Sequence, residues 1–162
     1  MRVSIITLSD SGYAGLREDE SGKVIRKMVE DFGYEVVTYD LLPDGQESLI
    51  EKFIQLCDAS VSDLILTTGG TGFSVSDQTP EATLKVIERE TTGISEAMRW
   101  NSLQITPRAM LSRATSGIRK STLIVNLPGS PKAVRECLEY ILPSLHHGLE
   151  ILKGDASNCA RV

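Results

Sequence analysis

A glycine-rich segment between a buried strand and a helix is the strongest chemical signal in this sequence. Residues 67–72 read Thr-Thr-Gly-Gly-Thr-Gly and follow directly on the apolar run Leu64–Leu66. Glycine lets backbone N–H groups approach a ligand closely, and the N-terminus of a helix carries partial positive charge. Taken alone, the segment also fits a tight turn that needs positive φ angles. The functional interpretation is a phosphate-binding loop, made of Gly69, Gly70, Thr71 and Gly72.

The common nucleotide-binding fingerprints do not fit this segment. A dinucleotide motif that starts at Gly70 needs glycine at position 75, where the chain has Val75. A Walker A loop that ends at the only Gly-Lys pair, Gly22-Lys23, needs glycine at position 17, where the chain has Arg17. Dinucleotide-dependent dehydrogenases and P-loop ATPases are therefore disfavoured.

Asp77 lies five residues after the glycine-rich segment and just before a predicted helix. The helix is expected to have Thr79 as its N-cap and Pro80 at its first position. A carboxylate repels phosphate but can hold the Mg²⁺ ion that binds phosphate. The alternative, which is favoured when Asp77 is taken alone, is a residue of the turn that complements the helix dipole.

Asp44 also has two interpretations. Asp44-Gly45-Gln46-Glu47 fits a capping box, with Asp44 as N-cap and Glu47 at the third helical position. Taken alone, capping is the favoured role. The expected location of Asp44 beside the glycine-rich segment and Asp77 points instead to a Mg²⁺ site, because gathered carboxylates near phosphate commonly hold that ion.

The elements that must position these residues alternate between strands and helices. Apolar runs predict strands at 3–8, 35–41, 63–68 and 122–127, and helical spacing predicts helices near 24–32, 49–57, 80–90, 94–104 and 131–145. No assignment is made for 107–120. The alternation favours a three-layer α/β/α fold with a mostly parallel sheet. Ligands of such sheets bind beyond the carboxyl ends of the strands, where Asp10, Asp44 and Asp77 are expected.

The C-terminal part begins with a clear helix signal. Ser130 is the expected N-cap, Pro131 the first helical residue, and Pro143 is expected to kink the helix. Residues 155–162 are expected to be a frayed tail. The whole chain, 1–162, is expected to form a single domain.

Composition excludes several other classes. The 162 residues carry a net charge of −5 with no long basic cluster, so nucleic acid is not an expected partner. Three cysteines without C-x-x-C spacing indicate neither a disulfide framework nor a zinc site. No signal peptide and no apolar run of about 20 residues is present, so a cytoplasmic location without a membrane span is expected.

Six short motifs, taken together and in order, resemble the molybdopterin adenylyltransferase family, whose members include MogA-like proteins and the G domains of plant proteins and gephyrin. The resemblance covers nearly the whole chain. The motifs are Ser9-Asp10-Ser11, Leu42-Pro43-Asp44, residues 67–72, residues 77–83, Ile105-Thr106-Pro107 with Leu111-Ser112-Arg113, and residues 126–133.

The resemblance implies roles for individual residues. Asp44 and Asp77 match the two carboxylates needed for activity and metal binding, and residues 69–72 match the nucleotide-binding loop. Ser102 and Ser112 match positions that contact molybdopterin. The segment 92–96 departs from the family pattern but keeps its glutamate. The other cofactor-binding residues that the resemblance implies are Ser9, Asp10, Glu96, Pro128 and Gly129.

The activity implied by the resemblance is the transfer of AMP from ATP to the terminal phosphate of molybdopterin, with Mg²⁺ as cofactor and release of pyrophosphate. The implied assembly is a homotrimer or a pair of trimers, and a molybdenum-insertion protein is a possible downstream partner. Two alternatives stay open: a non-catalytic scaffold that binds molybdopterin, and a related domain, as in the competence-damage protein family, that acts on another nucleotide or pterin.

Overall fold

The computed structural model describes residues 1–154, which form a six-stranded sheet in the order β2-β1-β3-β6-β5-β4. Four strands run parallel: β1 (Arg2–Leu8), β2 (Glu35–Leu42), β3 (Leu64–Thr68) and β6 (Thr122–Leu127). The sheet ends in β5 (Ser116–Arg119), antiparallel to β6, and the two-residue β4 (Arg89–Glu90). The predicted mostly parallel sheet is confirmed.

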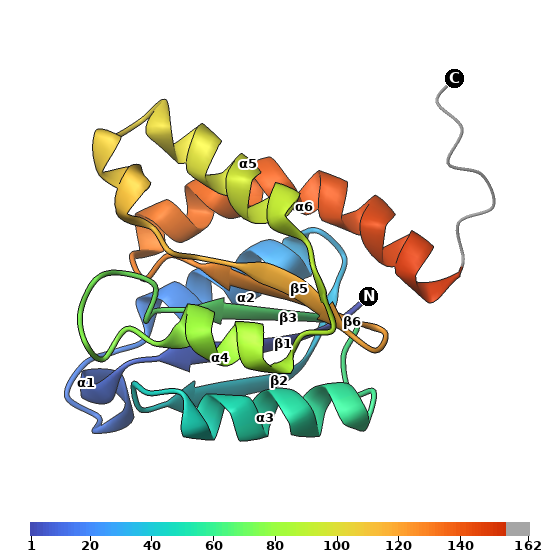
Figure 1. Ribbon diagram of the computed structural model, residues 1–162, viewed down its shortest axis with the longest axis horizontal. Helices are drawn as coiled ribbons and strands as arrows, with labels where there is room; N and C mark the ends of the chain where they lie inside the picture. Colours follow the sequence, from blue (N-terminus) through green and yellow to red (C-terminus); the bar gives the residue numbers. More distant parts are fainter. Residues whose placement is uncertain (155–162) are drawn as a thin grey trace.

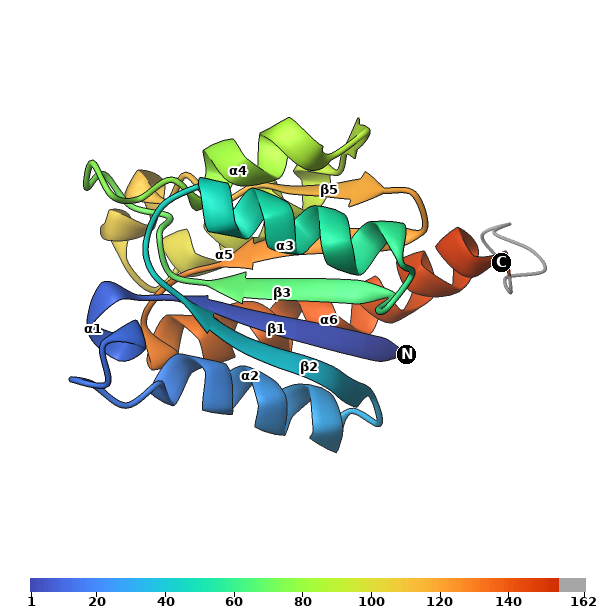
Figure 2. The ribbon, with the colours of Figure 1, turned by 90° about the horizontal axis from the view of Figure 1, so that it is seen from below.

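Helices cover both faces of this sheet (Figures 1 and 2). One face carries α2 (Glu20–Asp31), α5 (Thr92–Leu103) and α6 (Pro131–Lys153). The other carries α3 (Glu47–Asp58) and α4 (Thr79–Val86). Two short helices lie near the carboxyl ends of the strands, namely α1 (Asp10–Tyr13) and the 3₁₀ helix η1 (Pro107–Leu111).

The three layers arise because successive side chains of a strand point to opposite faces of the sheet, and these strands carry apolar side chains on both faces. In β1, Val3 and Ile5 pack with α2 and α6, whereas Ile6 and Leu8 pack with α3 and α4. Successive side chains of a strand point to opposite faces, so a strand that is apolar throughout can join two cores. The near-continuous apolar runs of the sequence therefore required helices on both faces.

Three segments differ from the sequence prediction or were left without one. The helix predicted for 80–90 ends at Val86, because Ile87 is extended and Arg89 pairs with Ile118 of β5. The residues after Leu8, for which no helix was predicted, form the short helix α1. The unassigned stretch 107–120 holds η1 and β5.

The predictions for the C-terminal helix and tail are confirmed only in part. Helix α6 begins as predicted, with the Ser130 side chain accepting a hydrogen bond from the N–H of Ala133, and it runs through Pro143 to Lys153. A kink at Pro143 and the single-domain organisation stay predictions. The predicted tail, 155–162, lies outside the described residues.

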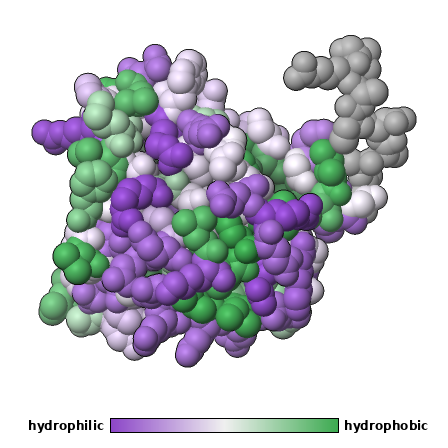
Figure 3. Space-filling view, in the orientation of Figure 1, coloured by the Kyte–Doolittle hydropathy of each residue, from purple (hydrophilic) through white to green (hydrophobic). Residues whose placement is uncertain are grey.

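The surface of the described part is mixed. Figure 3 shows a face that is largely polar, with apolar side chains reaching the surface in patches. Some of these lie over the loop between β3 and α4, where Phe73 and Val75 are strongly exposed. Among the helices of residues 1–154, none combines the length and the apolar character that a membrane crossing needs.

Candidate functional site

The carboxyl ends of the parallel strands meet at one rim of the sheet. The strand register aligns Leu8 with Leu42, Thr7 with Thr68, and Thr68 with Leu127. Strands β1 and β3 are neighbours in the sheet. The connection that leaves β1 leads to β2 on one side of this pair, and the connection that leaves β3 leads away on the other side. Such a switch point is the usual ligand site of an open α/β sheet. The loop that follows β3 here is the glycine-rich segment.

Two glycines of the loop hold backbone conformations that other residues avoid. Gly69 has φ of +95° and Gly70 has φ of +66°. A Cβ atom at Gly69 would overlap the carbonyl oxygen of Leu8 at the end of β1, and one at Gly70 would overlap the hydroxyl of Thr79. Both the conformation and the space therefore require glycine at these two positions. The loop lies close against neighbouring backbone, as a ligand cradle does.

Thr79 forms hydrogen bonds to the glycine loop and does not act as the N-cap of helix α4. Its hydroxyl donates to the carbonyl of Gly69 at 2.9 Å, and its N–H donates to the carbonyl of Gly70 at 3.1 Å. Helix α4 begins at Thr79 itself, with Gln78 as an N-cap whose side chain makes no capping hydrogen bond. The prediction of Thr79 as N-cap was therefore wrong, because its hydroxyl is engaged by the glycine loop.

Arg113, which follows η1, holds the other end of the loop. Its N–H donates to the carbonyl of Thr71 at 3.0 Å, and its Nε donates to the carbonyl of Gly72 at 2.7 Å. The remaining guanidinium nitrogens bind the carbonyl of Asp77 and the carboxylate of Glu81. The sequence singled out Arg113 as part of the Leu111-Ser112-Arg113 motif but did not predict these partners. Its planar set of donors suits several acceptors at once.

Loss of the Arg113 side chain is therefore expected to loosen the glycine loop. In Arg113→Ala, the carbonyls of Gly72 and Asp77 lose a charged donor. If the loop binds ATP, as the family resemblance implies, the KM for ATP should rise about 10–100-fold, as for lost hydrogen bonds to a charged group. Steady-state kinetics check this expectation. Arg26→Ala is the control, because Arg26 forms only an exposed ion pair with Glu30 on α2. An unchanged KM in Arg113→Ala would contradict the anchoring role.

Asp44 pairs with Asp10 across the rim. The N–H of Asp10 donates to Asp44 Oδ2 at 3.1 Å, and the N–H of Asp44 donates to Asp10 Oδ1 at 2.9 Å. The capping box predicted for Asp44 was wrong, because α3 begins at Glu47 with Gln46 as an N-cap that makes no side-chain hydrogen bond. Asp44 therefore does not cap α3, and its carboxylate instead accepts the N–H of Asp10 at the start of α1.

The carboxylates of the rim influence one another. Burial raises the pKa of Asp44, the N–H of Asp10 partly offsets this, and the negative charges of Asp10 and Asp77 raise it again. Asp77 Oδ2 accepts from the N–H of Ser74 at 2.8 Å, so the predicted turn role of Asp77 is real and leaves further lone pairs available. Asp10 and Asp44 therefore lie in contact, and Asp77 is near enough for its charge to affect Asp44.

These residues fit a Mg²⁺ ion that is shared with phosphate. Residues 1–154 contain no group of three or more metal-ligating side chains that could enclose a cation alone. Magnesium keeps several waters and is usually held by one or two carboxylates together with substrate phosphates. A cation beside Asp44 would also relieve the repulsion from Asp10 and Asp77 that disfavours its charged form.

The raised pKa of Asp44 makes a prediction for the protein without metal. Ionisation of Asp44 costs folding free energy, and this cost is absent below about pH 3.9 and complete above the raised folded-state pKa. In EDTA at neutral pH, Asp44→Asn should therefore be more stable than the wild type, by about 0.5 kcal/mol for a half-exposed charge. Urea denaturation across pH 4–7 checks this. A gap that shrinks as the pH rises would contradict the assigned cause.

A small polar pocket of about 170 Å³ adjoins the switch point and contains Ser9 and Gly129. The Ser9 hydroxyl accepts from the N–H of Gly12 and so caps α1. Gly129 packs against Gly69, and its carbonyl accepts from the hydroxyl of Ser21 at 2.7 Å. The preceding carbonyl, that of Pro128, accepts from Thr68 at 2.7 Å. The predicted residues Ser9, Pro128 and Gly129 thus lie beside the glycine loop.

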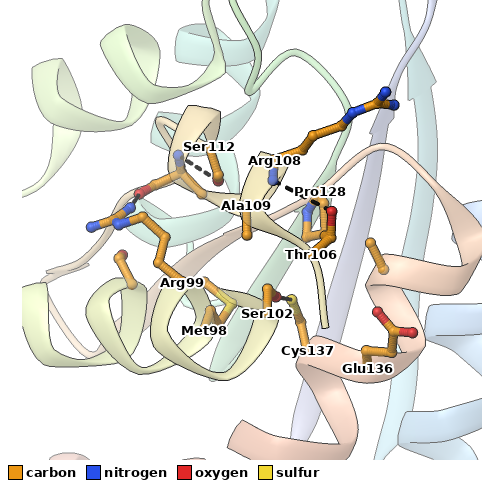
Figure 4. A pocket seen from close by; sticks show the side chains of 13 residues that line it. Met98, Arg99, Ser102, Thr106, Arg108, Ala109, Ser112, Pro128, Glu136 and Cys137 are labelled. Carbon is orange, nitrogen blue, oxygen red and sulfur yellow. Dashed lines mark hydrogen bonds between the residues drawn. The ribbon is translucent and has the colours of Figure 1, made fainter. Parts of the chain in front are cut away.

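A second, mostly apolar pocket of about 220 Å³ lies between α5, η1 and the start of α6 (Figure 4). We call it the interhelical pocket. Ser102 and Ser112 line it from different elements, as the resemblance implied for a common ligand. Its apolar lining residues are Met98, Ala109, Ala114, Pro128 and Ala133, and its other lining residues are Ser95, Arg99, Thr106, Arg108, Glu136 and Cys137.

The two pockets meet the glycine loop from different sides. Pro128 lines the interhelical pocket and is followed by Gly129, which packs against Gly69. Ser112 also lines the pocket and precedes Arg113, the anchor of Gly72. Glu96 stands apart, because it lies on the exposed side of α5 and lines neither pocket.

Comparison with known proteins gives a consistent picture. Residues 4–147 match the family described as a probable molybdopterin binding domain. The chain is 38% identical over 157 residues to a molybdopterin adenylyltransferase of Helicobacter pylori, which covers 96% of this chain and 89% of that protein. It is 42% identical to gephyrin of Dictyostelium discoideum, with 93% of this chain but only 22% of gephyrin covered.

Solved structures agree in fold. The molybdopterin biosynthesis enzyme MoaB of Thermus thermophilus is 45% identical, with a TM-score of 0.89 over 94% of this chain and 96% of that one. A structure of MogA is 35% identical, with the same TM-score over 94% of this chain and 99% of that one. The predicted fold is confirmed. The chain therefore belongs to the molybdopterin-binding domain family that includes the molybdopterin adenylyltransferases.

Proposed function

We propose that this protein is a molybdopterin adenylyltransferase of molybdenum cofactor biosynthesis. It transfers AMP from ATP to the terminal phosphate of molybdopterin and releases pyrophosphate. The observation that carries the proposal is the meeting of the glycine loop, two carboxylates and the interhelical pocket at one rim of the sheet. The similarity to molybdopterin adenylyltransferases over 86–96% of the chain supports the same activity.

The reaction needs positioning more than it needs a base. An oxygen of the molybdopterin phosphate attacks the α-phosphorus of ATP, a new P–O bond forms, and the bond to pyrophosphate breaks. Because the nucleophile is already an anion, no proton has to be removed. The barrier lies in bringing two polyanions together in line, so catalysis rests on orientation and charge neutralisation.

The chain supplies the parts for this task. Backbone N–H groups of residues 69–72 would hold ATP phosphates, and the interhelical pocket would hold the pterin. Asp44 and Asp77 would hold Mg²⁺, which when bound neutralises phosphate charge. Glycine at positions 69 and 70 keeps the loop clear of side chains, and Arg113 fixes its far end. The strand ends are rigid, so these groups keep their relative positions.

Pyrophosphate release tests the proposal directly. Purified protein with ATP, Mg²⁺ and molybdopterin is expected to release one pyrophosphate per adenylyl-molybdopterin formed, and to release none without molybdopterin. No release from folded protein that still binds molybdopterin would support the scaffold function instead. A magnesium-dependent thermal shift with ATP gives a second readout, because a ligand stabilises the state that binds it.

A homotrimer, or a pair of trimers, is part of the same proposal. Trp100 is 59% exposed on α5 and lies 6.5 Å from Tyr140 of α6, ring centre to ring centre. Leu103, one turn after Trp100 on α5, and Ile105, which follows the helix, are also exposed, and a second copy could cover these apolar side chains. Light scattering measures the assembly. A cytoplasmic location, and delivery of the product to a molybdenum-insertion protein, are proposed on the family resemblance.

A further inference from the structure

The interhelical pocket contains a single carboxylate among its lining residues, that of Glu136. The pocket wall around it is mainly apolar, with Met98, Ala109 and Ala133 among its members. A charged group in such a wall costs free energy unless a ligand or solvent satisfies it. Glu136 is therefore the feature of this pocket that most needs a chemical explanation.

The Glu136 side chain is held in place but keeps its acceptors available. Its backbone carbonyl accepts from Asn101 Nδ2 of α5 at 3.4 Å, which fixes this turn of α6 against α5. The side chain is 24% exposed, and its ion pair with Lys132 is long, at 3.9 Å. Burial raises the pKa of the neighbouring Cys137 thiol, and the charge of Glu136 adds to that rise. Both oxygens can thus receive a ligand.

Charge separates the two ends of the pocket. Figure 4 shows Glu136 on the α6 side and Ser112 on the opposite side, after η1. Ser112 adjoins Arg113, which binds the carbonyl of Gly72 in the glycine loop. A phosphate is repelled by the Glu136 carboxylate and attracted toward the N–H groups of the loop. An elongated ligand with a phosphate at one end therefore places its other end at Glu136.

The ring system of a pterin matches a carboxylate at that end. Its 2-amino-4-oxo pyrimidine edge presents two parallel donors, N3–H and the 2-amino group, and a carboxylate presents two parallel acceptors. We propose that Glu136 is the specificity-determining residue of the interhelical pocket, which binds the N3–H and 2-amino edge of the pterin through both carboxylate oxygens. The proposal rests on the proposed function, because it names how the same substrate is recognised.

A pair of matched probes isolates this contact. Both 6,7-dimethylpterin and 6,7-dimethyllumazine are fluorescent and differ at C2, where the pterin has an amino group and the lumazine a carbonyl oxygen. That oxygen would face the Glu136 carboxylate. Wild-type protein is therefore expected to bind the pterin about 10–100-fold more tightly in fluorescence titrations at pH 7, as expected for a hydrogen bond to a charged group. Equal affinities would overturn the proposal.

Substitutions at position 136 should redirect this preference. In Glu136→Gln, the side chain offers one acceptor and one donor, which complement N3–H and the C2 oxygen of the lumazine. The preference for pterin should vanish or reverse. Glu136→Asp keeps two acceptors on a shorter arm, so it should bind more weakly but retain the preference. A preference that survives Glu136→Gln unchanged would show that Glu136 does not contact this edge.

Glu139→Gln is the matched control. Glu139 lies three residues later on α6 and lines a separate groove with Met28 and Phe32 of the α2 side. Its substitution should leave both affinities unchanged, and a changed preference would assign the effect to the charge of α6 as a whole. Thermal melts of all variants verify folding. Substitution of Glu136 should change the melting temperature little, because its ion pair with Lys132 is long and weak.

Kinetics separate this proposal from the proposed function. With molybdopterin and ATP, Glu136→Gln should raise the KM for molybdopterin at least about tenfold and leave the KM for ATP and the kcat unchanged. Pterin selectivity that depends on Glu136, without any pyrophosphate release, would overturn the adenylyl transfer and keep the recognition role. Pyrophosphate release without a preference for the pterin probe would support adenylyl transfer and overturn the recognition role of Glu136.

Discussion

Asp77→Asn is expected to lower the kcat of adenylyl transfer about 100–1000-fold, the size seen when one preorganised charge-stabilising group is removed. Asparagine keeps the shape of the side chain and can still accept the hydrogen bond that the Ser74 N–H donates to Asp77. The loop should therefore keep its conformation, and Tm should stay within about 2 °C, the range of a surface substitution. Only the negative charge that would hold Mg²⁺ is lost.

The measurement pairs pyrophosphate release with magnesium titration. If Asp77 holds the ion, then the half-saturating Mg²⁺ concentration rises in the variant, and saturating Mg²⁺ recovers only part of kcat. Asp31→Asn serves as control, because Asp31 is exposed and forms an i,i+4 ion pair with Lys27 on α2. Full activity in Asp77→Asn at ordinary Mg²⁺ would sink the metal-binding role of this carboxylate.

Hydrophobic periodicity and the residue types of the loops were enough to predict most of the fold. The parallel strands are apolar on both faces, so the sequence indicated a sheet covered by helices, and the switch-point rule then placed Asp10, Asp44 and Asp77 at one rim. The hydrogen bonds between Asp10 and Asp44 confirm that these two residues lie together. Short elements were not predicted, because a strand of two residues such as Arg89–Glu90 is too short to show hydrophobic periodicity.

Contacts between segments distant in sequence were not predictable in the same way. Arg113 binds carbonyls 36 and 41 positions earlier in the chain, and no pattern in its local sequence predicts these two partners. Asp44 shows the opposite case. A local capping pattern is present that would start the helix at Gly45, but the helix begins two residues later, at Glu47. Local patterns locate elements, whereas the choice of hydrogen-bond partner depends on which groups the tertiary fold brings within reach.

Glycine at position 69 is expected to be the least replaceable residue of the loop. In Gly69→Ala, the new Cβ overlaps the carbonyl oxygen of Leu8. This oxygen belongs to the backbone of β1 and cannot yield without disturbing the pairing of Leu8 with Leu42 of β2. Strain at φ of +95° adds to this overlap. We expect a loss of about 3 kcal/mol in the free energy of unfolding and a fall in kcat/KM for ATP of about 100-fold or more.

Gly33→Ala separates strain from overlap. Gly33 has nearly the same φ, +91°, but a Cβ there meets no atom within 4 Å. The control should therefore lose only the cost of a left-handed conformation, about 1–2 kcal/mol, and keep full activity. Urea denaturation and kcat/KM for ATP are measured on both variants. If the two lose equal stability and Gly69→Ala stays active, the close approach of the loop to β1 has no part in nucleotide binding. If only Gly69→Ala loses activity, the backbone contact at the switch point is what shapes the phosphate cradle.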